Sequence, residues 1–132
     1  MPSANRVASS TLLVVAVALP SPQDLQARRN PERFFDERVA PILTRRCLGC
    51  HNDQLKNAEI SFQDRDTLLK GGGRGPAIVP GKPEMSVMIQ VLSHDGAVQM
   101  PPGPKLPSKE IAVLVEWIQS GAVWGTKLRS GR

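Results

Sequence analysis

One stretch decides the fold of this chain: Cys47-Leu48-Gly49-Cys50-His51. Its C-x-x-C-H spacing is that of a c-type haem attachment site. Two thiols separated by two residues can reach the two vinyl groups on one edge of a porphyrin and form thioether bonds. The imidazole that follows is then held under the ring, where a nitrogen can bind the iron. The sequence therefore predicts one covalently attached haem c, held by Cys47, Cys50 and His51.

The same side chains could instead serve a disulfide, a thioredoxin-like redox pair or a zinc ion. A disulfide or redox pair would leave His51 without a role, and the redox pair needs a strand-to-helix context that the sequence lacks. Zinc needs four ligands, and the chain offers only Cys47, Cys50, His51 and His94 in an unsuitable spacing. Haem uses the whole motif, and it leaves no cysteine for a structural disulfide.

The first 27 residues have the character of an export signal rather than of a folded segment. The apolar run 11–19 has the length of a signal-peptide core, is too short to span a bilayer, and ends at Pro20. Ala27 offers a cleavage point, and an uncleaved membrane anchor is the alternative. Covalent haem attachment is normally completed outside the cytoplasm, so we expect a periplasmic or otherwise exported protein.

The composition leaves the remaining domain of about 105 residues with little material for a core. The 132-residue sequence contains three Phe, two Trp and no Tyr, so a buried porphyrin would supply missing apolar bulk. The net charge of +5 could steer the domain toward an acidic partner. The basic residues are scattered and not interleaved with aromatic ones, which argues against nucleic-acid binding.

Helical periodicity predicts an all-α domain over 28–124 and a polar tail over 125–132. A first helix is expected to begin at the N-cap Asn30, with Pro31 at its first position. Pro41 lies inside the apolar pattern of this helix, so we expect a kink or a fresh start there. No stretch has the alternating pattern of a strand.

Three further helices are expected along the chain. A short one covers 64–70, and another starts at Pro83 and places Met85, Met88, Ile89 and Leu92 on one face. The last begins at the cap Ser108 and ends at Gly121, and its apolar stripe consists of Ile111, Leu114, Val115 and Ile118. The first and last helices are expected to pack together beside the haem.

The residue on the other side of the iron decides the chemistry of such a haem, and Met85, Met88, His94 and Met100 could supply it. Met85 and Met88 lie on the buried face of a predicted helix, which favours core packing. His94 stands in what looks like a solvated turn, and its use would give a bis-histidine centre. Pro101 biases Met100 toward extended backbone in a proline-stiffened loop. We therefore predict Met100 as the distal ligand.

Two accessory features are also expected around the haem. The second ring nitrogen of His51 needs a carbonyl or carboxylate acceptor, and the segment Gly75-Pro76 is our candidate. The glycine-rich run 71–75 lacks the strand-to-helix setting and the Lys-Ser/Thr ending of a P-loop. We interpret it as a turn whose backbone approaches a flat ligand closely.

Several motifs follow one another along the chain in a defined order. They are Phe35…Val39-Ala40-Pro41-Ile42-Leu43, then Cys47 to His51, then Gly72-Gly73-Arg74-Gly75-Pro76-Ala77-Ile78-Val79-Pro80-Gly81, then Met100-Pro101-Pro102, Leu106-Pro107-Ser108 and Trp117-Ile118-Gln119-Ser120-Gly121-Ala122-Val123-Trp124. This series resembles the planctomycete-type cytochrome c domain. The resemblance implies a small class I cytochrome c-like fold, with Cys47 and Cys50 as attachment cysteines, His51 as proximal ligand and Met100 as distal ligand. In this family the domain often opens a longer exported protein, and both a stand-alone and a truncated chain fit the sequence.

These features favour a one-electron carrier that works with a redox partner protein. If His51 and Met100 occupy both axial positions, no site for a substrate remains at the iron. The alternative is a haem-based module that binds or senses a gas or peroxide after Met100 dissociates. No paired carboxylates, nucleophile–base set or distal acid–base histidine stand out, so no enzymatic activity is expected. Membrane contact is expected only if the N-terminal segment is uncleaved.

Overall fold

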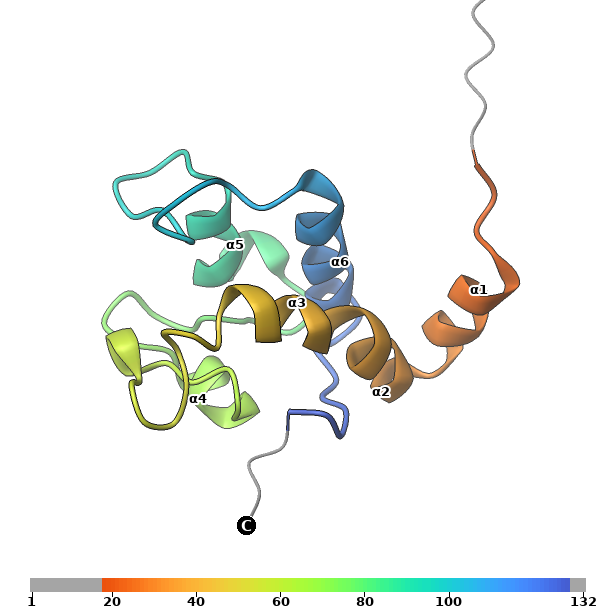
Figure 1. The fold of residues 1–132 in the computed structure, drawn as a ribbon, viewed down its shortest axis with the longest axis horizontal. Helices are drawn as coiled ribbons and strands as arrows, with labels where there is room; N and C mark the ends of the chain where they lie inside the picture. The colour runs from red at the N-terminus through yellow and green to blue at the C-terminus, as the bar shows by residue number, and fades with distance from the viewer. Residues whose placement is uncertain (1–17, 129–132) are drawn as a thin grey trace, which may run out of the picture.

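A computed structural model describes residues 18–128, and the elements in this range are short helices (Figure 1). Within the range, the pairing of Gly72 with Gly75 is an isolated bridge, so the predicted all-α class is confirmed. The predicted signal core over 11–19 falls almost wholly outside the described residues. Every helix within 18–128 is too short or too polar to cross a membrane. In chain order the elements are α1 (Pro22–Arg29), α2 (Pro31–Phe34), the π-helical turn η1 (Phe35–Val39), α3 (Ala40–Arg46), η2 (Asn57–Glu59), α4 (Arg65–Lys70), η3 (Pro83–Met85), α5 (Val87–Leu92) and α6 (Ser108–Gln119).

The interruption predicted at Pro41 takes the form of the π-helical turn η1, which lies directly before it. The side chain of Asn30 caps α2 by accepting a hydrogen bond from the Arg33 N–H at 3.1 Å, as predicted. The Ala40 N–H donates to the carbonyl of Phe35, five residues back. Pro41 has no N–H, and in a regular helix its ring would collide with a carbonyl of the preceding turn. The wider π-turn leaves room for the Pro41 ring, so that α2, η1 and α3 follow one another as one continuous helical rod.

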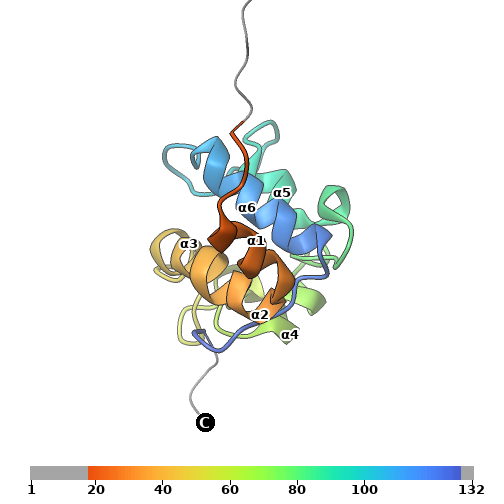
Figure 2. The ribbon, with the colours of Figure 1, turned by 90° about the vertical axis from the view of Figure 1, so that its right-hand side faces the viewer.

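The α2–η1–α3 rod packs against α6, which confirms the predicted contact between the first and last predicted helices. Figures 1 and 2 both show α6 next to this rod, and in Figure 1 the two cross. Phe35 is fully buried at the junction, with its ring centroid 5.6 Å from that of Trp117 and 4.3 Å from that of Trp124. Offset aromatic pairs at these separations stabilise a contact beyond the area that they bury.

The C-terminal end of α6 is capped by Gly121 and is hydrogen-bonded to the start of α4. Gly121 has φ +107°, its N–H donates to the carbonyl of Ile118, and the Ala122 N–H donates to that of Trp117, so the helix ends in a Schellman motif, as the glycine predicts. The guanidinium of Arg65 donates to the Ala122 carbonyl at 2.8 Å. The start of α4 is thereby fixed to the end of α6.

Two details of the predicted helices were wrong. Pro83–Met85 is a 3-10 turn, and α5 starts only after Ser86, whose hydroxyl accepts from the Val79 N–H and donates to the Lys82 carbonyl. Ser86 is extended, with φ −85° and ψ 118°, and so separates this turn from α5. Met85 therefore does not share the face of Met88, and it is 56% exposed. Ser108 is the first residue of α6 rather than its cap, a position that Pro107 occupies.

The described part of the predicted polar tail, residues 125–128, contacts η1 through Asp36. The Asp36 carboxylate accepts hydrogen bonds from the backbone N–H groups of Thr126 and Lys127 and from the Thr126 hydroxyl, at 2.7–2.9 Å. Burial by itself would raise the pKa of this carboxyl. The hydrogen bonds lower its pKa by more than burial raises it, so the pKa lies below its ordinary value. These hydrogen bonds join the segment that follows Trp124 to η1.

Replacing Ile118 with alanine tests the packing of α6. The side chain is fully buried, so Ile118→Ala is expected to lower the free energy of unfolding by about 2–5 kcal/mol. Urea unfolding of the two proteins measures the difference. Lys109→Ala, at an exposed position of the same helix, is the control and should stay within about 0.5 kcal/mol of the parent. Equal effects of the two changes would show that α6 packs through another face.

Candidate functional site

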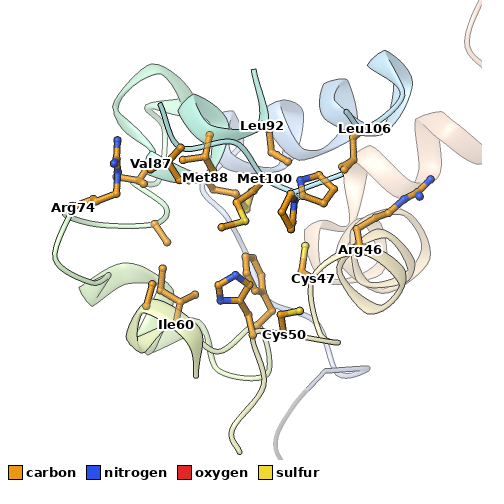
Figure 3. A pocket seen from close by; sticks show the side chains of 18 residues that line it. Arg46, Cys47, Cys50, Ile60, Arg74, Val87, Met88, Leu92, Met100 and Leu106 are labelled. Atoms are coloured by element: carbon orange, nitrogen blue, oxygen red, sulfur yellow. The ribbon is translucent and has the colours of Figure 1, made fainter. Parts of the chain in front are cut away.

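An apolar pocket lies between the segment that follows α3 and the α5 region. About 850 Å³ of space lies between its walls, and part of this space is open to solvent. Figure 3 shows Met88 and Met100 on one side of this space and Cys50 on the opposite side. Arg46 and Arg74 lie at opposite ends of the pocket in this view.

The end of α3 places both cysteines on the pocket wall. Cys47 is the C-cap of the helix, and its carbonyl accepts hydrogen bonds from the N–H groups of Cys50 and His51, at 3.2 and 2.9 Å. This tight turn brings all three residues of the predicted motif to the pocket. Cys47 is half-buried and Cys50 exposed, and the two thiols are not joined in a disulfide. Burial raises the pKa of the Cys47 thiol to about 12, although the charge of Arg46 opposes the shift.

His51 is oriented by a hydrogen bond that it donates to a carbonyl of its own loop. Its Nδ1 lies 2.8 Å from the carbonyl oxygen of Asn57, and its ring meets Phe62 edge-on, with centroids 5.7 Å apart. A carbonyl oxygen can only accept, so Nδ1 carries the proton and Nε2 keeps its lone pair for a metal. The predicted acceptor, the segment Gly75-Pro76, was wrong.

No sequence signal identified Asn57 as the acceptor. The loop has positive φ at three residues that are not glycine: Lys56 with φ +26°, Ala58 with φ +55° and Glu59 with φ +64°. Such residues are uncommon in this conformation, so the direction of the preceding carbonyl was not predictable from residue type.

Met100 and Met88 both line the pocket, whereas Met85 and His94 do not. Met88 is buried on α5, and Met100 follows that helix in a loop. The Met100 N–H donates to the carbonyl of Val91 in α5 at 3.0 Å, so the loop is fixed to the helix. The structure therefore leaves two thioethers within the pocket, of which only Met100 was predicted to face the iron.

His94 is not the solvated histidine that its sequence context suggested. It is half-buried, and its Nε2 lies 3.0 Å from the carbonyl oxygen of Met100. The ring nitrogen that could have bound iron is thus engaged outside the pocket lining.

The glycine-rich run serves backbone packing more than contact with a ligand. A side chain on Gly71 would collide with the backbone of Gly75, and its φ of +71° also favours glycine. The residues of this region that reach the pocket are Arg74 and Ala77. Arg74 has no hydrogen-bond or ion-pair partner among residues 18–128, so its charge is available at the pocket end.

An ion pair joins the end of α3, beside the cysteines, to the start of α6. The guanidinium of Arg46 donates to the two carboxylate oxygens of Glu110 at 2.9 and 3.2 Å, and Arg45 approaches the same group at 3.5 Å. The hydrogen bond from Arg46 lowers the pKa of Glu110 below its ordinary value, and the nearby charges add to this.

The lowered pKa of Glu110 predicts an acid-sensitive contribution to stability. It is complete above the pKa of the unfolded chain, about 4.3, and is lost as the pH falls through the lower folded value. Glu110→Gln is therefore expected to be less stable than the parent at pH 7 and equal to it in strong acid, where Glu110 is protonated. Urea unfolding at several pH values measures the difference. A constant difference at every pH would contradict this assignment.

The residues present fit a haem group. Two thiols lie on the pocket wall, one imidazole offers a free Nε2, a thioether lies across the pocket, and the walls are mainly apolar. Within the part of the chain that the structure describes, no three His, Cys, Asp or Glu residues gather as a site for a bare metal ion. The zinc alternative therefore has no support in the described structure.

Comparisons with known proteins agree with this geometry. Residues 47–104 match a family model described as Planctomycete cytochrome C. The matched segment begins at the first cysteine of the motif and includes Met100. No curated protein and no solved structure matches the chain.

Proposed function

Residues 47–104 belong to the planctomycete cytochrome c family, and on this premise we propose that the domain is a one-electron carrier with His51 and Met100 as axial ligands. Membership makes the domain a haem-binding c-type cytochrome, a family in which the haem is covalently attached. The observation that carries the proposal is the hydrogen bond between His51 Nδ1 and the Asn57 carbonyl. It fixes the tautomer that a proximal ligand needs.

The chain's own residues would hold and tune the group. Cys47 and Cys50 would form the thioether bonds, His51 would bind through Nε2, and Met100 would contribute its sulfur from the other side. A bound haem supplies reversible one-electron oxidation of its iron. If His51 and Met100 both bind the iron, no position remains for a substrate, and the haem would supply electron transfer.

The pocket walls support the same role. Val87, Leu92 and Leu106 contribute apolar surface, which around a bound haem would disfavour the more highly charged oxidised state. The positive charge of Arg74 at one end of the pocket would act in the same direction, whereas the charge of Arg46 is paired with Glu110. Arg74, away from the cysteines, is also suited to meet the carboxylate side chains of a haem attached through Cys47 and Cys50.

Location and partner follow from the sequence. One attachment motif and two cysteines in the whole sequence support one haem per chain. C-type cytochrome domains are typically exported, and the signal-like segment over 1–27 supports export of this domain over 28–124. The net charge of +5 supports an acidic redox partner.

Potentiometry of the purified exported protein tests the proposal. Absorption spectra recorded through oxidation and reduction are expected to interconvert reversibly and to fit a single one-electron step. The double variant Cys47→Ala, Cys50→Ala is the control for signal from unattached haem. A centre that does not cycle reversibly would contradict electron transfer.

One observation favours the alternative of gas or peroxide binding, namely that Met100 belongs to a loop rather than to a helix. Exposure of the reduced protein to carbon monoxide separates the two functions. An electron carrier is expected to leave the spectrum unchanged, whereas a sensor with a displaceable Met100 would bind the gas readily.

A further inference from the structure

We infer that His94 is a positioning residue that holds Met100 in place as the distal ligand. This inference rests on the proposed function, because it takes Met100 as the ligand. Its basis is the 3.0 Å separation between His94 Nε2 and the Met100 carbonyl oxygen, in a ring that is not part of the pocket lining. His94 therefore acts on the ligand through the backbone, without touching the haem position.

The direction of this hydrogen bond is fixed by chemistry. The Met100 carbonyl can only accept, so Nε2 of His94 carries the proton and donates it. No other donor reaches this oxygen among the described residues. The peptide that it belongs to links Met100 to Pro101, which has no N–H and cannot anchor the loop from the other side.

Two hydrogen bonds hold the backbone of Met100, one at its N–H and one at its C=O. Its N–H donates to the Val91 carbonyl in α5, and its C=O accepts from His94. His94 itself has φ +60°, a left-handed conformation that histidine adopts more readily than most residues other than glycine. The side-chain amide of Gln99 closes the same turn by donating to the carbonyls of His94 and Gly96, at 3.0 and 3.4 Å.

The consequence is resistance to displacement of the thioether by outside ligands. An external ligand can bind at the iron only when the Met100 sulfur moves away. The hydrogen bond from His94 opposes the part of this motion that displaces the Met100 backbone. The net contribution of one such hydrogen bond predicts that losing the donor raises the apparent affinity for an external ligand about 2- to 12-fold.

Titration of the oxidised holoprotein with imidazole, followed by absorption, measures this affinity. His94→Asn keeps a residue that tolerates left-handed backbone but is too short to reach the Met100 carbonyl. His94→Gln places an amide N–H near the original Nε2 position. We expect the gain in imidazole affinity in His94→Asn and a return toward the parent value in His94→Gln. Equal haem absorbance per chain shows that attachment is unchanged, and His94→Ala is the second donor-free variant.

Two comparisons make the result decisive. Unchanged imidazole affinity in both donor-free variants would overturn the inference, and so would an equal gain in Gln99→Ala, which loosens the turn without removing the His94 donor. The variant Met100→Ala tests the proposed function separately from the role of His94. If Met100 is the ligand, this variant binds imidazole far more tightly than the parent, and if it is not, its affinity stays at the parent value.

Discussion

Replacement of both Cys47 and Cys50 by alanine is expected to abolish covalent haem attachment. The two thiols on the pocket wall are the only thiols of the sequence, so no other side chain can form a thioether bond to a vinyl group. Haem stained after denaturing electrophoresis of the exported protein measures the loss. Extraction with acidified acetone gives an independent measure, because it removes unattached haem and leaves thioether-linked haem on the polypeptide.

The single variants provide the matched controls. Cys47→Ala and Cys50→Ala each keep one thiol, and each is expected to retain some attached haem at a lower yield. The double variant also exposes apolar walls to water, so its thermal unfolding temperature is expected to fall. Haem that remains bound to the double variant through denaturation, or a fully native-like protein without haem, would contradict this account of the site.

Replacement of Met100 by alanine is expected to convert a closed iron centre into an open one. Iron–thioether coordination gives oxidised cytochromes a weak absorption toward the red end of the visible range, and this band should disappear. The reduction potential should fall, because the soft thioether stabilises the reduced iron more than its replacement does. Carbon monoxide, excluded from the parent, should bind the reduced variant. Absorption spectra and potentiometry measure these three changes.

Met88→Ala is the matched control for this experiment. Met88 is buried on the same side of the pocket, and its loss removes a thioether without removing the proposed ligand. The red band should persist in this variant. Persistence of the band in Met100→Ala and its loss in Met88→Ala would transfer the ligand to α5.

Those parts of the fold that depend on local chemistry were predictable from the sequence. Asn30 and Asp64 cap their helices because a short polar side chain can accept from a backbone N–H two or three residues on. Gly121 ends α6 because its left-handed backbone suits glycine. The C-x-x-C-H spacing likewise brought Cys47, Cys50 and His51 to one wall, since the turn that joins them is short.

Features set by tertiary contacts were not predictable in the same way. His94 was interpreted from its polar neighbours, but its contact depends on where the loop returns to Met100 six residues later. Met85 was placed on a helical face that does not exist, because Ser86 makes buried hydrogen bonds and restarts the helix. Asn57 carries no side-chain signal, since only its backbone carbonyl serves His51.

The packing of the α2–η1–α3 rod against α6 decides which part of the chain can be transferred to another protein as a folded unit. The family match begins one residue after Arg46 and ends six residues before Glu110, so this ion pair joins the two flanks of the matched segment. Phe35 and Trp117, which meet in the core, both lie outside it. A fragment cut at the matched boundaries would carry the attachment motif but neither of the helices that close its ends. The smallest transferable module therefore includes the α2–η1–α3 rod and α6. A gene fusion that preserves only the recognisable segment separates the haem-binding residues from the contacts that Phe35 in η1 and Arg46 in α3 make with α6.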